Sequence, residues 1–185
     1  VSTSTTDLNG DGLNEDTVTR TTVLNDDGSR TTTTLTQNGD LSTRSETIRT
    51  VNDDGLEVTM KTDADADGAY ERVEASVETW SSNGERTTLS TVKAQDTSLL
   101  SQAETVVSDD GLVVTRKTDG DGDGTFDLSE VETTAYLADG ATRTTTSLTD
   151  LPGTLRSETV TTASDNGRDV LTERDLNGDG ATDMR

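Results

Sequence analysis

The stretch Asp119 to Asp127, DGDGDGTFD, is one of four copies of the pattern Asp-x-(Asp/Asn)-x-Asp-Gly-x-x-(Asp/Glu). The other copies begin at Asp7 (DLNGDGLNE), Asp63 (DADADGAYE) and Asp175 (DLNGDGATD), so each copy starts 56 residues after the one before it. A fixed interval of this length is typical of a tandem array. The spacing predicts repeats over 7–62, 63–118 and 119–174, with the end of a preceding repeat in 1–6 and the start of a fourth in 175–185.

Glycine-bearing turns divide each interval further. Gly28, Gly84 and Gly140 mark one turn, and a second turn occurs 27 residues later in each repeat, at Gly55, Gly111 and Gly167. A third, looser turn falls near Asn38-Gly39, Asp96-Thr97 and Pro152-Gly153. Asn-Gly and Asp-Gly between alternating segments are strong hairpin signals. Together with the acidic loop, these turns predict four short strands per repeat.

The segments between the turns alternate with a period of two. Small or β-branched residues occupy every second position of 17–23, 73–79 and 129–135, and the residues between them are mostly polar or charged. This period is typical of a strand, and no helical spacing of apolar residues occurs. We therefore expect an all-β, antiparallel and elongated tandem array, with two thin sheet faces in contact or a narrow tube. Blades like those of a β-propeller or the coils of a β-solenoid are alternatives that the sequence leaves open.

The acidic pattern itself predicts a calcium loop in each repeat. Carboxylate or amide oxygens at positions 1, 3 and 5, a backbone carbonyl at position 7 and an acid at position 9 would surround one ion, and Gly at position 6 permits the bend. Oxygen ligands without sulfur or nitrogen favour Ca²⁺ over Zn²⁺. The predicted ligands are Asp7, Asn9, Asp11, Leu13 and Glu15; Asp63, Asp65, Asp67, Ala69 and Glu71; Asp119, Asp121, Asp123, Thr125 and Asp127; and Asp175, Asn177, Asp179, Ala181 and Asp183.

The loops resemble the calcium loops of FG-GAP/VCBS-type repeats, and DLNGDGATD at Asp175 to Asp183 looks like that family's form. The resemblance implies calcium ligation by Asp7, Asn9, Asp11 and Glu15 and by their counterparts in the other loops. The Phe-Gly and Gly-Ala-Pro signatures of that family are missing here. The threonine-rich units punctuated by Asp-Gly are also similar to tandem repeats of large secreted bacterial adhesins, which implies a role at a cell surface.

The composition limits both the core and the partners. Only 27% of the residues are hydrophobic, and the formal net charge is −22. A hydrophobic core would therefore be thin, so we expect bound metal to supply part of the folding free energy. The acidity removes the electrostatic basis for nucleic-acid binding, and no apolar stretch approaches the roughly 18 residues of a membrane span. With no Cys or His, thiolate and imidazole chemistry is excluded, and we expect no enzyme activity.

These features predict a calcium-binding structural segment of a large secreted or cell-surface bacterial protein, such as an adhesin stalk, a spacer or an extracellular filament. Neighbouring repeats of the same chain are the expected partners, with self-association into fibres or a surface glycan as further options. The chain opens VSTSTTDLNG, with neither Met nor a signal peptide, so we interpret it as part of a longer protein. An extracellular location is expected because weak carboxylate loops fill at millimolar calcium. The alternative is a ligand-binding module that uses a threonine-rich β face for polysaccharide or ice.

Overall fold

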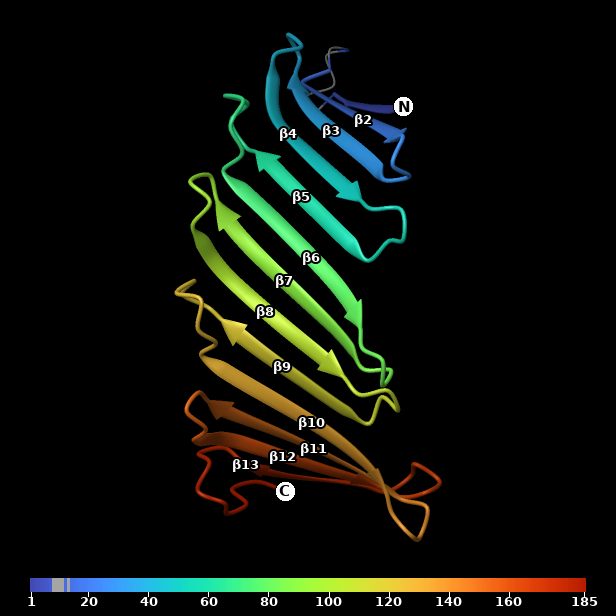
Figure 1. Cartoon of the computed structure of the whole chain (residues 1–185), viewed down its shortest axis with the longest axis vertical. Coiled ribbons are helices and arrows are strands. Elements are labelled where there is room, and N and C mark those ends of the chain that lie inside the picture. The colour runs from blue at the N-terminus through green and yellow to red at the C-terminus, as the bar shows by residue number, and fades with distance from the viewer. Residues whose placement is uncertain (8–11, 13) are drawn as a thin grey trace. The chain divides into compact units, whose positions relative to one another are not determined.

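The chain folds entirely into β-strands and turns over the residues that a computed structural model describes, namely 1–7, 12 and 14–185 (Figure 1). No helix occurs among them. The strands are β1 (Ser2–Thr6), β2 (Asp16–Leu24), β3 (Arg30–Asn38), β4 (Thr43–Val51), β5 (Glu57–Asp63), β6 (Arg72–Trp80), β7 (Arg86–Ala94), β8 (Leu99–Val107), β9 (Val113–Asp119), β10 (Leu128–Tyr136), β11 (Thr142–Asp150), β12 (Leu155–Ala163) and β13 (Val170–Asp175).

These strands form one open sheet in which chain order and spatial order are identical, from β1 to β13. Each strand from β2 to β12 therefore lies beside the strand before it and the strand after it in an antiparallel meander, and β1 and β13 are the edge strands of the described sheet. The all-β, antiparallel prediction is confirmed. The expectation of two sheet faces in contact, or of a tube, is wrong, because every described strand belongs to the same sheet.

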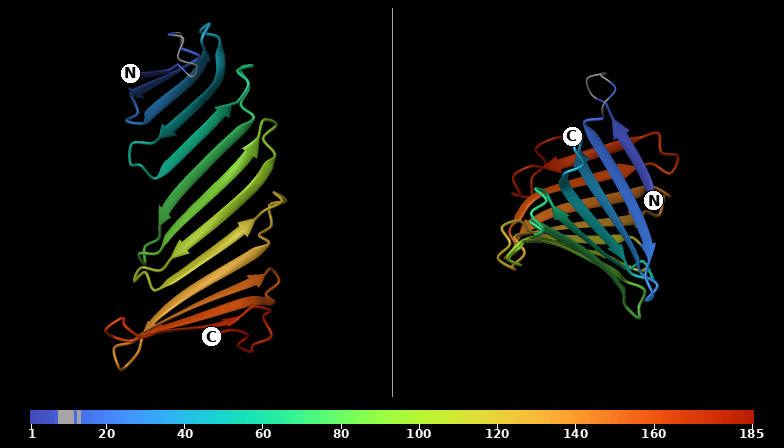
Figure 2. Two further views of the ribbon diagram at one scale, coloured as in Figure 1. Left: turned by 180° about the vertical axis from the view of Figure 1, so that it is seen from behind. Right: turned by 90° about the horizontal axis from the view of Figure 1, so that it is seen from above.

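The order of the strands along the chain can be followed by colour in Figure 2. The chain divides into two compact units, each of which is an antiparallel stretch of this meander. The first unit comprises Val1–Val77 and Ser90–Leu100, and it contains β1 to β5 with most of β6 and the second half of β7. The second unit comprises Glu78–Leu89 and Ser101–Arg185, and it contains β9 to β13 with most of β8. The first unit holds the loop that joins β5 to β6, and the second unit holds the loop that joins β9 to β10.

Hydrophobic burial is slight in both units. Ala141, which is 6% exposed, is the one apolar residue that counts as buried in the described part of the chain. The other buried residues are polar, and they include Asp63, Asp119 and Asp175. A single sheet with solvent on both faces explains this, because its side chains find neighbours only within their own layer. The alternation predicted from the sequence is visible in β2, where the half-buried Thr17, Thr19 and Thr21 are each followed by an exposed residue.

Threonine hydroxyl groups pair across neighbouring strands. Thr22 Oγ1 lies 3.0 Å from Thr32 Oγ1 on the next strand, and Thr134 Oγ1 lies 3.2 Å from Thr144 Oγ1. Cross-strand pairs of this kind stabilise a sheet without a hydrophobic core, by roughly 0.2–1 kcal/mol each. The abundance of threonine therefore has a structural explanation within the sheet.

The predicted turns occur where the glycine pattern placed them. In the β2–β3 turn the Gly28 amide donates to the Asn25 carbonyl over 3.1 Å, and Asn25 N donates to the Ser29 carbonyl over 2.8 Å. Gly28 has a φ of +83°, which glycine adopts without strain. Within the described ranges no helix is long and apolar enough to cross a bilayer.

Candidate metal centre

The acidic loops begin on the last residue of a strand. Asp63 ends β5, Asp119 ends β9 and Asp175 ends β13, so the first predicted ligand of each of these loops is held by the sheet itself. The exposed fractions of these residues are 4%, 1% and 7%, which makes them the most deeply buried carboxylates in the described chain. A buried carboxylate requires hydrogen bonds or a cation.

Backbone amides of the loop supply those hydrogen bonds in the same way three times. Asp63 Oδ1 accepts from Ala66 N over 2.6 Å, and its Oδ2 accepts from Gly68 N over 3.0 Å. Asp119 accepts from Gly122 N and Gly124 N over 2.7 and 2.9 Å. Asp175 accepts from Gly178 N and Gly180 N, both over 2.7 Å. The loop thus curls around its first carboxylate, and this curl brings the later acidic residues toward it.

The closing acid completes the loop. Glu71 Oε2 accepts from Ala64 N over 2.7 Å, and Asp127 Oδ2 accepts from Gly120 N over 2.8 Å. Asp183 Oδ2 accepts from Leu176 N over 2.8 Å in the last loop. In each case the ninth residue of the pattern bonds to the amide of the second. This contact keeps the ninth carboxylate at the mouth of the loop, which is where the sequence pattern places a ligand.

Two groups of carboxylates are close enough together to hold a metal ion. Asp63, Asp65, Asp67 and Glu71 each offer an oxygen within 4.8 Å of the others, and so do Asp119, Asp121 and Asp127. The prediction of acidic groups that could bind metal is confirmed for these two loops. Asp123 lies outside the second group, and its Oδ1 accepts from Thr125 N over 2.7 Å.

The first and last loops show no such group of carboxylates among the described residues. In the last loop, Asp175, Asp179 and Asp183 do not form such a group, and Asn177 Oδ1 accepts from Asp179 N over 2.9 Å. In the first loop, Asp7 Oδ2 accepts from Gly12 N over 2.9 Å, and Glu15 N donates to the Thr6 carbonyl. The predicted ligands Asn9, Asp11 and Leu13 lie outside the described residues. The carbonyl ligands assigned to Ala69, Thr125 and Ala181 stay predictions.

A residue on the preceding strand faces each buried aspartate, and sequence reasoning missed this position. Strand register pairs Glu46 with Asp63, Gln102 with Asp119 and Glu158 with Asp175. Gln102 Nε2 lies 3.3 Å from Asp119 Oδ2 and 3.3 Å from the Gly124 carbonyl. These partners are 17 residues from the aspartate along the chain, and only the cross-strand register reveals them.

The residue at position eight is aromatic in two of the loops, Tyr70 in one and Phe126 in the other. The Tyr70 hydroxyl donates to Glu46 Oε2 over 3.3 Å. Burial and then the charge of Glu46 raise the pKa of Tyr70 above its usual value of 10.0. In the second unit, Phe126 lies 5.6 Å from Lys117 Nζ, and that ammonium forms a 2.8 Å ion pair with Glu104. Each aromatic ring thus lies beside a charged side chain on a nearby strand.

The hydrogen bonds also favour the ionised state of the last loop. Burial raises the pKa of Asp175, but the amides of Gly180, Gly178 and Asn177 lower it by more together, so the pKa lies below its usual 3.8. An ionised carboxylate is the form that binds a cation.

No family model matches the sequence, and no curated protein is similar to it.

Proposed function

We propose that this chain is a calcium-binding structural segment of a large secreted or cell-surface bacterial protein, where it serves as an adhesin stalk, a spacer or part of an extracellular filament. The observation that carries the proposal is the contrast between the two acidic groups and the nearly absent core. Four carboxylates in one loop and three in the other lie within 4.8 Å, while Ala141 is the one buried apolar residue among those described. Carboxylates held this close repel one another without a cation.

Calcium is the metal that this ligand chemistry suits. The side chains offer only oxygen, and Ca²⁺ accepts six to eight oxygen ligands in flexible geometry, whereas Mg²⁺ demands near-octahedral positions. Gly68 and Gly124 bend the two loops at φ values of +91° and +90°. Dissociation constants of about 0.1–1 mM are typical of extracellular calcium modules. Loops of this affinity would fill outside the cell, which is the basis for the proposed location.

A 56-residue structural unit is part of the proposal. Strands β2, β6 and β10 begin at Asp16, Arg72 and Leu128, which supports a repeated unit with the interval seen in the acidic pattern. Repeats of this kind gain stability from contacts with their neighbours. A segment of this type acts by holding other modules apart, and it needs no catalytic group.

Calcium titration tests the proposal. Isothermal calorimetry of the full chain should show uptake in the millimolar range, and at a free concentration ten times the dissociation constant each filled loop should add about 1.4 kcal/mol to the free energy of unfolding. Thermal melts followed by circular dichroism, with calcium and with EGTA, measure that gain. Melts that coincide under the two conditions, together with no heat of binding, would refute the calcium role.

Variants of single loops separate metal binding from a general charge effect. Asp63→Asn and Asp119→Asn should each weaken uptake by their own loop about 10-fold to 100-fold, in line with losses seen even for residues that only support a ligand. Asp26→Asn is the matched control, because Asp26 is an exposed turn residue outside the loops. Equal effects of all three substitutions would indicate nonspecific counterion binding. Thermal-hysteresis activity of the isolated chain, or its binding to neutral polysaccharides that carry no acidic residue, would instead favour a ligand-binding module that uses a threonine-rich face.

A further inference from the structure

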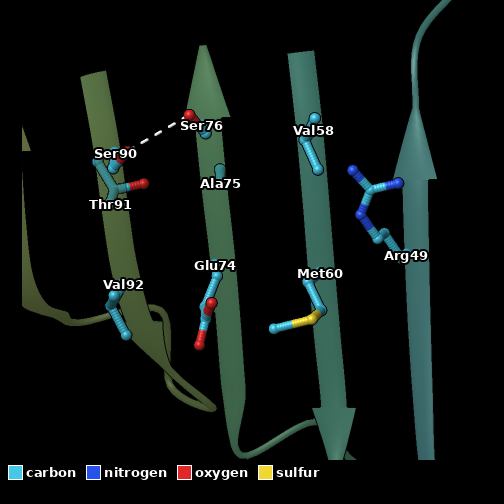
Figure 3. Close-up of a pocket in the computed structure, with 9 residues that line it drawn as sticks. All are labelled: Arg49, Val58, Met60, Glu74, Ala75, Ser76, Ser90, Thr91 and Val92. Atoms are coloured by element: carbon cyan, nitrogen blue, oxygen red, sulfur yellow. Dashed lines mark hydrogen bonds between the residues drawn. The ribbon is translucent and has the colours of Figure 1, made fainter. Parts of the chain in front are cut away.

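A hollow of about 260 Å³ lies on one face of the first unit, over β4 to β7 (Figure 3). Its lining includes Arg49, Val58, Met60, Glu74, Ser76 and Ser90. The lining is unlike the acidic loops, because it contains a guanidinium group, an apolar floor and three hydroxyl groups. None of these residues belongs to a proposed calcium loop.

The strand register explains how these side chains meet. Arg49 on β4 pairs with Met60 on β5, and Met60 pairs with Glu74 on β6. The three residues therefore form one row across three strands. At the usual strand spacing, the Cα atoms of Arg49 and Glu74 are about 10 Å apart. Figure 3 shows the Arg49 guanidinium turned toward β5 and the Met60 thioether extending toward Glu74. A molecule resting on Met60 would thus have a cation on one side and a carboxylate on the other.

The charges of this row are not balanced. Glu74 is already paired with the Arg72 guanidinium. The Arg49 guanidinium, in contrast, has no ion-pair or hydrogen-bond partner within the described residues. The uncompensated charge of the hollow is therefore positive, although the whole chain carries −22. A monoanion is attracted by Arg49, whereas a polyanion would be repelled by the surrounding acidic surface.

A second row, in the other unit, shows why the hollow is open here. Thr105 pairs with Arg116, and Arg116 pairs with Glu130. There the arginine occupies the middle position, and its Nη1 lies 2.8 Å from Glu130 Oε1. In the first unit the middle position holds Met60, and the arginine stands one strand away. This exchange leaves both the space above Met60 and the free guanidinium of Arg49.

The remaining groups define the chemistry of a ligand. Val58, Met60 and Val92 line the hollow with apolar atoms, and Ser90 Oγ donates to Ser76 Oγ over 3.3 Å. Ser76 Oγ keeps its own proton to donate, and Glu74 has a second oxygen to accept. A pyranose ring carrying one carboxylate matches this set: its C–H face meets the apolar floor, its hydroxyls meet serine and glutamate, and its carboxylate meets Arg49. Pockets for drug-sized ligands hold about 300–1,000 Å³, so 260 Å³ suits one sugar residue.

We propose that this hollow binds a single carboxylated sugar residue of the uronic-acid class, with Arg49 as the anchor of the carboxylate. The proposal does not depend on calcium binding by the loops. The ligand would be one acidic residue on an otherwise neutral glycan, because the net charge of the chain opposes a run of carboxylates.

Ligand-observed NMR on the full chain in calcium tests this with three probes: methyl β-D-glucuronide, the neutral methyl β-D-glucoside, and cyclohexanecarboxylate. The glucuronide should bind about tenfold more tightly than either comparison compound, because the glucoside lacks the carboxylate and cyclohexanecarboxylate lacks the hydroxyl groups. Equal binding of all three probes, or no saturation transfer to the glucuronide, would overturn the proposal.

Variants identify the site. Arg49→Gln should reduce glucuronide affinity about tenfold by removing the charge-assisted hydrogen bonds. Met60→Arg should abolish binding, because the new side chain would fill the hollow and pair with Glu74 as Arg116 pairs with Glu130. Arg116→Met is the matched control and should leave the affinity unchanged. If the glucuronide binds both pocket variants as it binds the original chain, its carboxylate is held elsewhere, for instance by loop-bound calcium, and the proposal fails. Circular dichroism of each variant verifies the fold.

Discussion

Aspartate at the third position of several turns bonds to the residue two positions later. Asp27 Oδ1 accepts from Ser29 N over 2.9 Å and from Ser29 Oγ over 2.6 Å. Asp96 accepts from Ser98 in the same way, with distances of 3.0 and 2.6 Å. The serine hydroxyl and then its amide hold the pKa of each aspartate below the ordinary 3.8. These contacts define the turns where no hydrophobic core is available to do so.

Replacing the serine should shift that pKa. Ser98→Ala removes the hydroxyl that contributes most to the depression, so the pKa of Asp96 should move up toward 3.8. Because the folded pKa is the lower one, the ionised turn contributes stability above the unfolded pKa, and this contribution is lost as the pH falls through the folded pKa. Side-chain carboxyl NMR titration measures the shift, with Asp27 as the internal control. No change at Asp96 would contradict the assigned role of Ser98.

Two glycines allow a matched test of backbone geometry. Gly28 and Gly55 have φ values of +83° and +78°, but a Cβ on Gly28 would lie 2.7 Å from Asp53 Cβ, whereas a Cβ on Gly55 would meet nothing within 4 Å. Gly55→Ala should lower the free energy of unfolding by about 1–2 kcal/mol through its left-handed backbone alone. Gly28→Ala should cost more, because two turns must also move apart. Chemical denaturation measures both, and equal losses would show that the turns separate without cost.

At the scale of the strand, the positions of strands and turns could be predicted from the sequence, but the residue pairs across neighbouring strands could not. The alternation of Thr17, Thr19 and Thr21, and glycines such as Gly28, indicated where strands and turns lie. The pairing of Glu46 with Asp63 depends on register, which is set by turn length and hydrogen bonding between strands. Nor could periodicity distinguish one open meander from two packed sheets, because small half-buried residues such as Ala75 and Val73 suit either arrangement.

Protection of backbone amides should be graded along the sheet. Strands such as β3 and β11 have a hydrogen-bonded neighbour on both sides, whereas β1 pairs only with β2 among the described strands. With so little apolar burial, local opening should compete with global unfolding. Hydrogen exchange in calcium, followed by mass spectrometry, should therefore show slow exchange in β3 and β11 and fast exchange in β1. Uniform protection across all strands would indicate a single cooperative unit instead.

At the scale of the whole molecule, charge repulsion opposes folding. The net charge is −22, and seven ion pairs, all between partly exposed side chains, lie in the described part of the chain. Such surface pairs each contribute about 0–1 kcal/mol. Four bound calcium ions would add eight positive charges and bring the net charge to −14, so bound metal would relieve part of the repulsion.

Salt should partly replace calcium. In EGTA, raising sodium chloride from 0.01 to 0.5 M should raise the melting temperature, because the Debye length falls from about 30 Å to below 8 Å. In saturating calcium the same change should have a smaller effect, since the closest carboxylates are then neutralised. Circular dichroism melts across this range provide the comparison. A salt effect that is no smaller with calcium would show that the loops contribute little to the repulsion.

The consecutive order of the strands also determines how the chain would respond to tension. Among the described strands, each one after β1 lies beside the strand that precedes it in the chain, and no crossover ties distant segments together. A force applied to the two ends would therefore peel hairpins apart one after another. Force spectroscopy of the chain should record a long series of small extensions at low force. A hairpin whose loop holds a metal ion should need a higher force to open than the others.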